Sequence, residues 1–195
     1  IAYSVDNSLQ NLGTDYLDLL LIHRPDPLMN ADEVADAFVR LKQSGKVRHF
    51  GVSNFTPYQF DLLQSRLDFP LVTNQVEVNP VNIFALHDGT LDQMQMKRIR
   101  PMIWSALGGG SIFTAQTEQA HRLRTVLGNV SEELGGVSLD QVIYAWVLKL
   151  PSQPLPIIGS GNIERVRSAV AAKEINLTRE QWFSIWEAAA GHEVP

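Results

Sequence analysis

The sequence predicts an α/β fold built on a sheet of parallel strands. Short runs rich in Leu, Ile and Val alternate with longer stretches whose apolar residues recur every three or four positions. The first run, residues 17–22, is almost wholly apolar, as expected of a strand covered on both faces. Each strand is followed by enough chain for a right-handed crossover, which builds either an open doubly wound sheet or part of an eight-stranded barrel.

Five strands and the helices between them can be placed by pattern. The first strand ends before two prolines in residues 23–27, and the first helix after it has Val34 and Leu41 on its apolar face and Gly45 as its stop signal. Thr56 and Pro57 fit an N-cap and a first helical residue. The expected strands are 17–22, 47–52, 71–78, 102–105 and 155–158. The expected later helices are 56–67, 90–97, 118–134, 138–150, 163–172 and 179–189, with a glycine loop at 108–110.

Length and composition exclude several classes of protein. The chain has 195 residues, a formal net charge of −5, 45% hydrophobic residues and no Cys, which suits a single domain over 1–195 and excludes disulfides and thiolate zinc sites. The five His show no metal-ligand spacing, so we expect no metal. Basic residues are spread along the chain, which argues against a nucleic-acid partner. No apolar stretch approaches the ~18 residues of a membrane span, and no secretion signal is visible, so we expect a cytoplasmic protein.

Polar residues recur where the expected strands end. Ligand sites of parallel α/β folds lie at the carboxyl ends of the strands, so one edge of the sheet is expected to collect these residues. In strand order they are His23, Ser53 and Asn54, Gln75 and Asn79, Trp104 and Ser105, and Gly159-Ser160-Gly161.

These residues have both structural and chemical interpretations. His23 can donate or accept a proton near neutral pH, although capping the strand is its plainer role. Ser53 and Asn54 fit an ordinary turn equally well. The amide of Gln75 must find partners if it is buried, and it could hold a ligand carboxamide. Trp104 is a common core residue type, but at the edge of a sheet it offers a flat face on which a ring can stack.

Two glycine-containing loops could receive phosphate groups. Ser105, Leu107 and the glycines after them supply backbone N–H groups that a pyrophosphate can approach, and residues 159–162 precede a helix whose N-terminus favours an anion. Arg165 and Arg167 occupy the first turns of that helix, where acidic residues are usually preferred. Either a bound phosphate or contact with solvent would account for the two positive charges there. Neither the Rossmann nor the P-loop fingerprint occurs, so a phosphate-binding barrel fits better.

Several segments together resemble one known family, the aldo-keto reductases, NAD(P)H-dependent carbonyl reductases with a TIM (β/α)8 barrel. In that family's strand order the resemblance covers the fourth to eighth strands, and the C-terminal residues are similar to a bacterial subgroup. The segments that carry it are Leu12–His23, Gly51–Phe55, Asn74–Glu77 with Asn79-Pro80, Trp104–Gly109, Ile157–Val166, and Trp182-Phe183 with Gly191–Pro195.

The resemblance implies a role for each residue at the strand ends. His23 would help to polarise the carbonyl of a small aldehyde or ketone substrate. Ser53, Asn54 and Gln75 would hold the nicotinamide carboxamide, and Trp104 would stack on the ring. Ser105, Leu107 and Gly108 would line the pyrophosphate, and Ser160, Gly161, Asn162 and Arg165 would meet the adenosine end. Arg165 would contact a 2′-phosphate, which favours NADPH over NADH.

The sequence also departs from the family's pattern. Gly159 stands where many members have Lys, and Ala169 where many have Asn. The family's Asp, the Tyr general acid of its Asp…Tyr-Gly motif and the Lys that lowers the pKa of that Tyr all come from the first three strands, and none of these motifs is present. We therefore expect an incomplete barrel of strands 4 to 8, completed by a missing N-terminal segment of the same protein, with little turnover by this chain alone.

Two other classes of function fit parts of the pattern. A non-catalytic nicotinamide-nucleotide-binding or regulatory subunit would keep the cofactor residues without the proton donor. An open α/β binding module unrelated to redox chemistry would keep only the architecture. An upstream Asp…Tyr-Gly motif in the same polypeptide would eliminate the first alternative.

Overall fold

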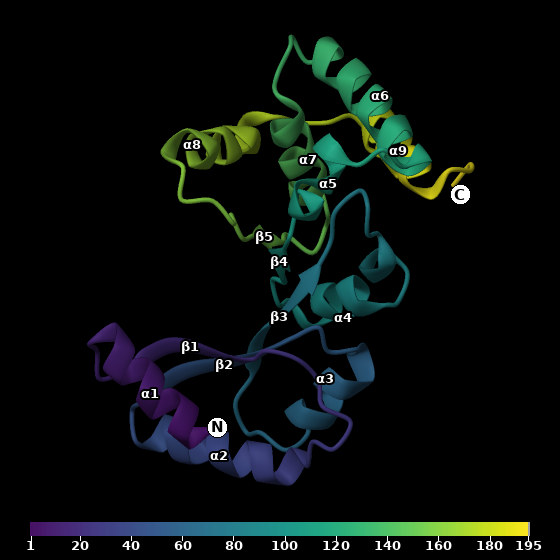
Figure 1. The fold of residues 1–195 in the computed structure, drawn as a ribbon. Helices are drawn as coiled ribbons and strands as arrows, with labels where there is room; N and C mark the ends of the chain where they lie inside the picture. Colours follow the sequence, from purple (N-terminus) through teal and green to yellow (C-terminus); the bar gives the residue numbers. More distant parts are fainter. Residues whose placement is uncertain (195) are drawn as a thin grey trace.

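A single parallel sheet lies at the centre of the computed structural model, which describes residues 1–194 (Figure 1). The strands are hydrogen-bonded in the order β1-β2-β3-β4-β5, and every neighbouring pair is parallel. The prediction of a parallel α/β fold is therefore confirmed. Within the described residues β1 and β5 are the two edges, so this sheet is open. The strands are β1 Leu17–Ile22, β2 Val47–Ser53, β3 Leu71–Glu77, β4 Met102–Trp104 and β5 Leu155–Pro156.

Helices connect all of these strands and extend beyond both ends of the sheet. Within residues 1–194 none of the helices combines the length and apolar character needed to cross a membrane. The α-helices are α1 Ala2–Leu12, α2 Ala31–Gln43, α3 Pro57–Gln64, α4 Thr90–Lys97, α5 Ser111–Thr114, α6 Glu118–Glu133, α7 Leu139–Leu148, α8 Ile163–Ala171 and α9 Arg179–Ala190. Three 3₁₀ turns are η1 Phe84–Leu86, η2 Gly108–Gly110 and η3 Ala172–Glu174.

Local side-chain bonds explain where α3 begins and ends. The Thr56 hydroxyl accepts from the backbone N–H of Gln59, whose side chain accepts from the backbone N–H of Thr56, and Pro57 opens the helix. The expected cap is therefore confirmed. The helix stops at Gln64 rather than continuing to residue 67. The Gln64 amide donates to the carbonyl of Phe69 and accepts from the N–H of Leu71, at 3.0 and 2.8 Å, and so closes the turn into β3.

The last two strands are shorter than the sequence predicts. β4 was expected to include Ser105, but this residue has a φ of 54° and turns the chain out of the sheet. β5 was expected to run to residue 158 and has only two residues. The N–H of Ile157 still donates to the carbonyl of Ile103 at 2.8 Å, but beyond Trp104 the turned chain offers no further ladder partner.

Two apolar clusters lie between the helices and one face of the sheet. The first joins α1, α2 and α3 to β2 through residues such as Phe38, Phe50 and Phe60, and it includes Leu71 at the start of β3. The second joins the C-terminal helices to the end of β3 and to β4. In Figure 1 α6 and α9 lie side by side in this second part, and their contacts are extensive. The cluster residues Phe50 and Val52 alternate along β2, and the register between β2 and β3 shifts between these two positions.

The opposite face of the sheet carries the other residues of each strand. On β2 these are His49, Gly51 and Ser53, and on β3 they are Thr73, Gln75 and Glu77. None of these six belongs to either cluster. A side chain at Gly51 would meet this face closely, because an added Cβ would lie 2.8 Å from the Thr73 carbonyl oxygen and 2.7 Å from a Leu21 methyl.

Gly51→Ala is expected to lower the free energy of unfolding by about 1–3 kcal/mol, because the backbone of β3 must shift to admit the methyl group. The matched control is Gly128→Ala, in the interior of α6, where an added Cβ would meet nothing within 4 Å. That change is expected to raise stability by roughly 0.5–1 kcal/mol, since Ala favours the helix. Urea unfolding of both variants measures the difference, and equal stabilities would contradict the close packing at Gly51.

Candidate functional site at the carboxyl edge of the sheet

The strand register brings most of the predicted residues to one edge of the sheet. Ser53 is the register partner of Gln75, and Glu77 is the partner of Trp104. Ile22, the last residue of β1, pairs with Val52, so His23 leaves the sheet at this same edge. The C-terminal ends of β1 to β4 thus meet as the sequence predicts.

A chain of hydrogen bonds links three of these strands. The indole Nε1–H of Trp104 donates to Asn54 Oδ1 at 3.0 Å, and Asn54 Nδ2 donates to Ser53 Oγ at 3.1 Å. Ser53 Oγ donates in turn to the backbone carbonyl of Gln75 at 2.9 Å, and the N–H of Asn54 reaches the same oxygen at 2.9 Å. Ser53 is buried, so in this structure its hydroxyl lies behind Asn54 and supports it.

Two residues at this edge have left-handed backbone conformations. Asn54 follows β2 with a φ of 58°, and Ser105 follows β4 with a φ of 54°. A non-glycine residue in this region costs about 1–3 kcal/mol and persists where its surroundings hold it. Arg98 and Gln153 have the same conformation outside the candidate site, so it is the hydrogen bonds around Asn54 and Ser105 that distinguish this edge.

Gln75 and His23 retain free polar atoms. Gln75 is half-buried, and its side chain lies on the face of the sheet that neither apolar cluster covers. Its bonds to the neighbouring strand come through its backbone carbonyl, and its side-chain amide has no hydrogen-bond partner within residues 1–194. His23 is exposed and likewise makes no side-chain hydrogen bond there. Both groups are available to a ligand.

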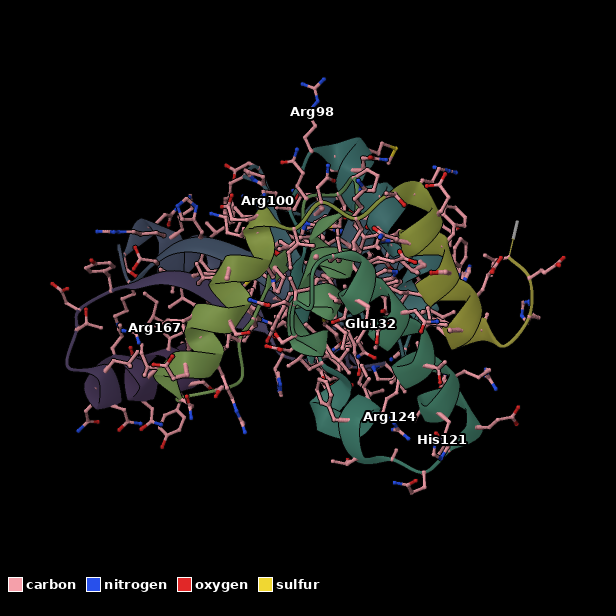
Figure 2. The ribbon with its side chains drawn as sticks, turned by 90° about the horizontal axis from the view of Figure 1, so that it is seen from above. Arg98, Arg100, His121, Arg124, Glu132 and Arg167 are labelled. Atoms are coloured by element: carbon pink, nitrogen blue, oxygen red, sulfur yellow. The ribbon has the colours of Figure 1, made fainter. Side chains whose placement is uncertain are left out.

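The loop after β4 is fixed from two sides. Its three glycines have φ values of 59°, 62° and 87°, and the N–H of Gly108 donates to the carbonyl of Ser105 at 2.7 Å. Arg124 holds the short helix α5 beyond them by donating to the carbonyls of Ile112 and Ala115, at 2.9 and 2.8 Å. Figure 2 shows Arg124 beside His121, which it also contacts. An added Cβ at Gly109 would meet nothing within 4 Å, so the loop leaves space beside it.

Side chains of the loop after β5 cap the N-terminus of α8. Asn162 Oδ1 accepts from the N–H groups of Glu164 and Arg165, at 2.9 and 3.3 Å, and Ser160 Oγ accepts from the N–H of Asn162 at 3.2 Å. Arg167 is paired with Glu164 at 2.6 Å. Arg165 is exposed and has no ion-pair partner within residues 1–194. The loop leaves the sheet at the same edge, but no hydrogen bond joins it to residues 105–110.

Asn79 was expected at this edge without a role, and the group that it forms with Glu77 and Asn82 was not predicted. Glu77 Oε1 and Oε2 accept from the amides of Asn79 and Asn82, at 3.0 and 2.9 Å. Asn79 is 0% exposed. The sequence contains a signal for this group, because the polar residues Glu77, Asn79 and Asn82 come at and just after the end of an apolar strand. No cluster of three or more side chains suited to a metal occurs in the part of the chain that is described.

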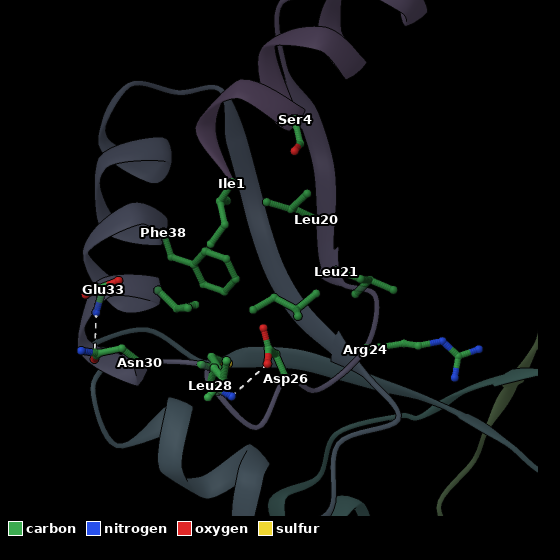
Figure 3. A pocket seen from close by; sticks show the side chains of 13 residues that line it. Ile1, Ser4, Leu20, Leu21, Arg24, Asp26, Leu28, Asn30, Glu33 and Phe38 are labelled. Atoms are coloured by element: carbon green, nitrogen blue, oxygen red, sulfur yellow. Dashed lines mark hydrogen bonds between the residues drawn. The ribbon is translucent and has the colours of Figure 1, made fainter.

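A cavity of about 410 Å³ lies beside β1 and reaches the carboxyl end of this strand at Ile22 and Arg24. It is bounded by the start of α1, by β1 and by α2, with Leu20, Ile22 and Phe38 in its wall (Figure 3). Leu28 beside it is 90% exposed. None of the predicted site residues lines it. The cavity borders the edge strand β1.

Comparison with known proteins identifies the family. The model of the aldo/keto reductase family matches residues 1–190. The chain belongs to the aldo/keto reductase family. Oxidoreductases of this family generally use NAD(P)H. The resemblance inferred from the strand-end residues is thereby confirmed at the level of the family.

Relatives and solved structures agree with this assignment. Oxidoreductase YdhF of Escherichia coli is 66% identical over 195 residues, and a 6-dehydroglucose reductase of Agrobacterium fabrum is 43% identical over 194 residues. Both matches cover 100% of this chain, but only 65% and 64% of those proteins. The thermostable aldo-keto reductase Tm1743 matches with a TM-score of 0.86 and 28% identity, over 96% of this chain and 65% of that one. The chain thus spans about 65% of the length of such relatives.

Proposed function

We propose that the protein containing this chain reduces a small aldehyde or ketone with NADPH. The observation that carries the proposal is the bonded chain from Trp104 through Asn54 and Ser53 to Gln75, which lies at the ligand-binding edge of a sheet in an aldo/keto reductase. The name of the 6-dehydroglucose reductase relative supports the reductive direction. NADPH, when bound, would supply the hydride to the carbonyl carbon.

The residues present fit such a cofactor. The free amide of Gln75 and the Asn54 side chain would bind the carboxamide, while the bond from Trp104 to Asn54 fixes the plane on which the ring stacks. The N–H groups of the turn formed by Ser105, Leu107 and Gly108 would face the pyrophosphate. At the adenosine end, Ser160, Gly161 and the N-cap Asn162 precede α8, and Arg165 lies in its first turn. The guanidinium of Arg165, which has no ion-pair partner within residues 1–194, suits a 2′-phosphate.

His23 would act on the substrate rather than on the cofactor. Its exposed imidazole leaves the sheet beside β2 and has no partner within residues 1–194. An N–H donor at this place would stabilise the negative charge that develops on the carbonyl oxygen. A proton must still reach that oxygen, and we assign this step to residues outside this chain.

We further propose that β1 to β5 are strands four to eight of a TIM barrel and that an N-terminal segment of the same polypeptide supplies the first three. The two open edges, the exposed cavity beside β1 and the greater length of the relatives support this assignment. Paired edges would also remove the aggregation hazard of an open sheet. The Tyr, Asp and Lys of the family's catalytic set would come from that segment.

The intact protein is expected to oxidise NADPH when an aldehyde or ketone is added, and this chain alone is expected to show little or no turnover. The measurement is the loss of absorbance of the reduced nicotinamide with a panel of small carbonyl compounds. Cofactor binding by the intact protein without any turnover would favour the regulatory-subunit alternative. Absence of both binding and turnover would reject the proposal.

The same assay tests the preference for NADPH. Arg165→Ala is expected to raise the KM for NADPH by roughly tenfold or more and to leave that for NADH unchanged, because a charged hydrogen bond to the 2′-phosphate is lost. Arg167→Ala is the matched control, since Arg167 is already paired with Glu164. Equal effects of the two substitutions would contradict the assignment of Arg165.

A further inference from the structure

We propose that Asn79 is a positioning residue that holds the turn at residues 105–108 in the form that receives the cofactor's pyrophosphate. The inference rests on the proposed NADPH site and assigns a cause to the shape of one part of it. Asn79 lies two residues beyond β3 and is completely buried, at 0% exposure. It is therefore positioned to act on the neighbouring loop and not on a ligand.

All the hydrogen-bonding capacity of the Asn79 amide is used within the chain. Its Oδ1 accepts from the backbone N–H groups of Val81 and Asn82, both at 2.9 Å. Its Nδ2 donates to Glu77 Oε1 at 3.0 Å and to the Ser105 carbonyl at 2.9 Å. An amide has two N–H donors and two acceptor lone pairs, so none remains for a ligand.

The bond to Ser105 is the one that reaches the cofactor loop. Ser105 has a left-handed conformation, which is unfavourable for a residue with a side chain and needs to be held by its surroundings. Its carbonyl accepts both from Asn79 Nδ2 and from the N–H of Gly108, at 2.9 and 2.7 Å. An added Cβ at Gly108 would lie 3.4 Å from Asn79 Oδ1, so the amide also borders the turn.

Glu77 fixes which way the Asn79 amide points. A carboxylate only accepts hydrogen bonds, so the NH₂ end of the amide must face it, and this places the second N–H toward Ser105. Asn82 Nδ2 holds the other carboxylate oxygen at 2.9 Å. The Asn79 side chain thereby links the end of β3 to the backbone carbonyl of Ser105 in the loop after β4.

Two isosteric substitutions separate this role from general stability. Asn79→Asp and Asn82→Asp each replace an amide donor to Glu77 by a second carboxylate, but only the first also removes the bond to Ser105. Each variant of the intact protein would be titrated with NADPH and with 2′,5′-ADP, which contains the adenosine end without the pyrophosphate and nicotinamide. Thermal unfolding and kcat at saturating NADPH would be measured alongside.

Asn79→Asp is expected to weaken NADPH binding by roughly tenfold, to leave 2′,5′-ADP binding within about twofold, and to change kcat little. Asn82→Asp is expected to lower the unfolding temperature by less, because Asn82 is only half-buried, and to leave both affinities near wild type. Equal NADPH affinities in the two variants would overturn the inference, as would equal weakening of both ligands by Asn79→Asp. If the wild-type protein binds neither ligand, the proposed function fails instead. If Asn79→Asp does not fold, Asn79→Ser keeps an oxygen for the turn and loses the bond to Ser105.

Discussion

His23→Ala in the intact protein is expected to lower kcat for carbonyl reduction by about 10²-fold or more while leaving the affinity for NADPH unchanged. Removing a hydrogen-bond donor from the place where negative charge develops in the transition state lowers kcat by about 10²–10³-fold. His23 can fill this role because it is exposed at the carboxyl edge and makes no side-chain hydrogen bond within residues 1–194. Steady-state kinetics and a cofactor titration together separate the two effects.

Two further variants sharpen this test. His23→Gln keeps an N–H donor and is expected to retain more activity than His23→Ala, which would distinguish hydrogen bonding from proton transfer. His121→Gln is the control, since His121 contacts Arg124 on the outside of the molecule. A kcat for His23→Ala within about twofold of wild type, in a variant that folds, would remove His23 from the mechanism.

Trp146→Ala is expected to lower the free energy of unfolding by about 3–5 kcal/mol, the usual cost of truncating a buried aromatic residue to Ala. Trp146 is 0% exposed and stacks on Trp182, with ring centroids 5.1 Å apart. The two indole N–H groups donate to each other's backbone carbonyls, both at 3.0 Å. The truncation therefore leaves a cavity and a carbonyl without its donor.

The control for this prediction lies in the same cluster. Trp186 has a buried indole Nε1 without a partner in the described residues, so Trp186→Phe removes an unsatisfied donor and is expected to change stability by less than about 1 kcal/mol. Urea unfolding followed by circular dichroism measures both variants. If the two substitutions destabilise the protein equally, the reciprocal Trp146–Trp182 pair is not what stabilises this cluster.

The strands could be placed from the sequence because they appear as short apolar runs between helical patterns, although within residues 1–194 the run at β1 is only half-buried. Their ends could not, because Ser105 leaves β4 through a left-handed turn that no residue type announces. The helix α5 and the turn η1 were missed since they are too short to show a helical period. The order of the strands in the sheet and their register could be determined only from the folded chain.

The sequence predicts which residues gather at the candidate site, but it does not predict which of their polar atoms are already hydrogen-bonded. Parallel strands share a carboxyl edge, so the amino-acid sequence alone was enough to expect Asn54, Gln75 and Trp104 together. Which polar atoms are already bonded depends on distances between strands. Only the folded chain shows that Ser53 supports Asn54, and that Asn79 reaches across to the loop after β4.

The strand β3 belongs to both apolar clusters. Its first residue, Leu71, packs into the cluster with α2 and α3, whereas Val76 near its end packs into the cluster with the C-terminal helices. Unfolding of either cluster therefore removes packing contacts that β3 supplies to the other. A dinucleotide bound across the ends of β2, β3 and β4 would contact strands of both clusters, and its binding free energy would stabilise the folded arrangement of the two.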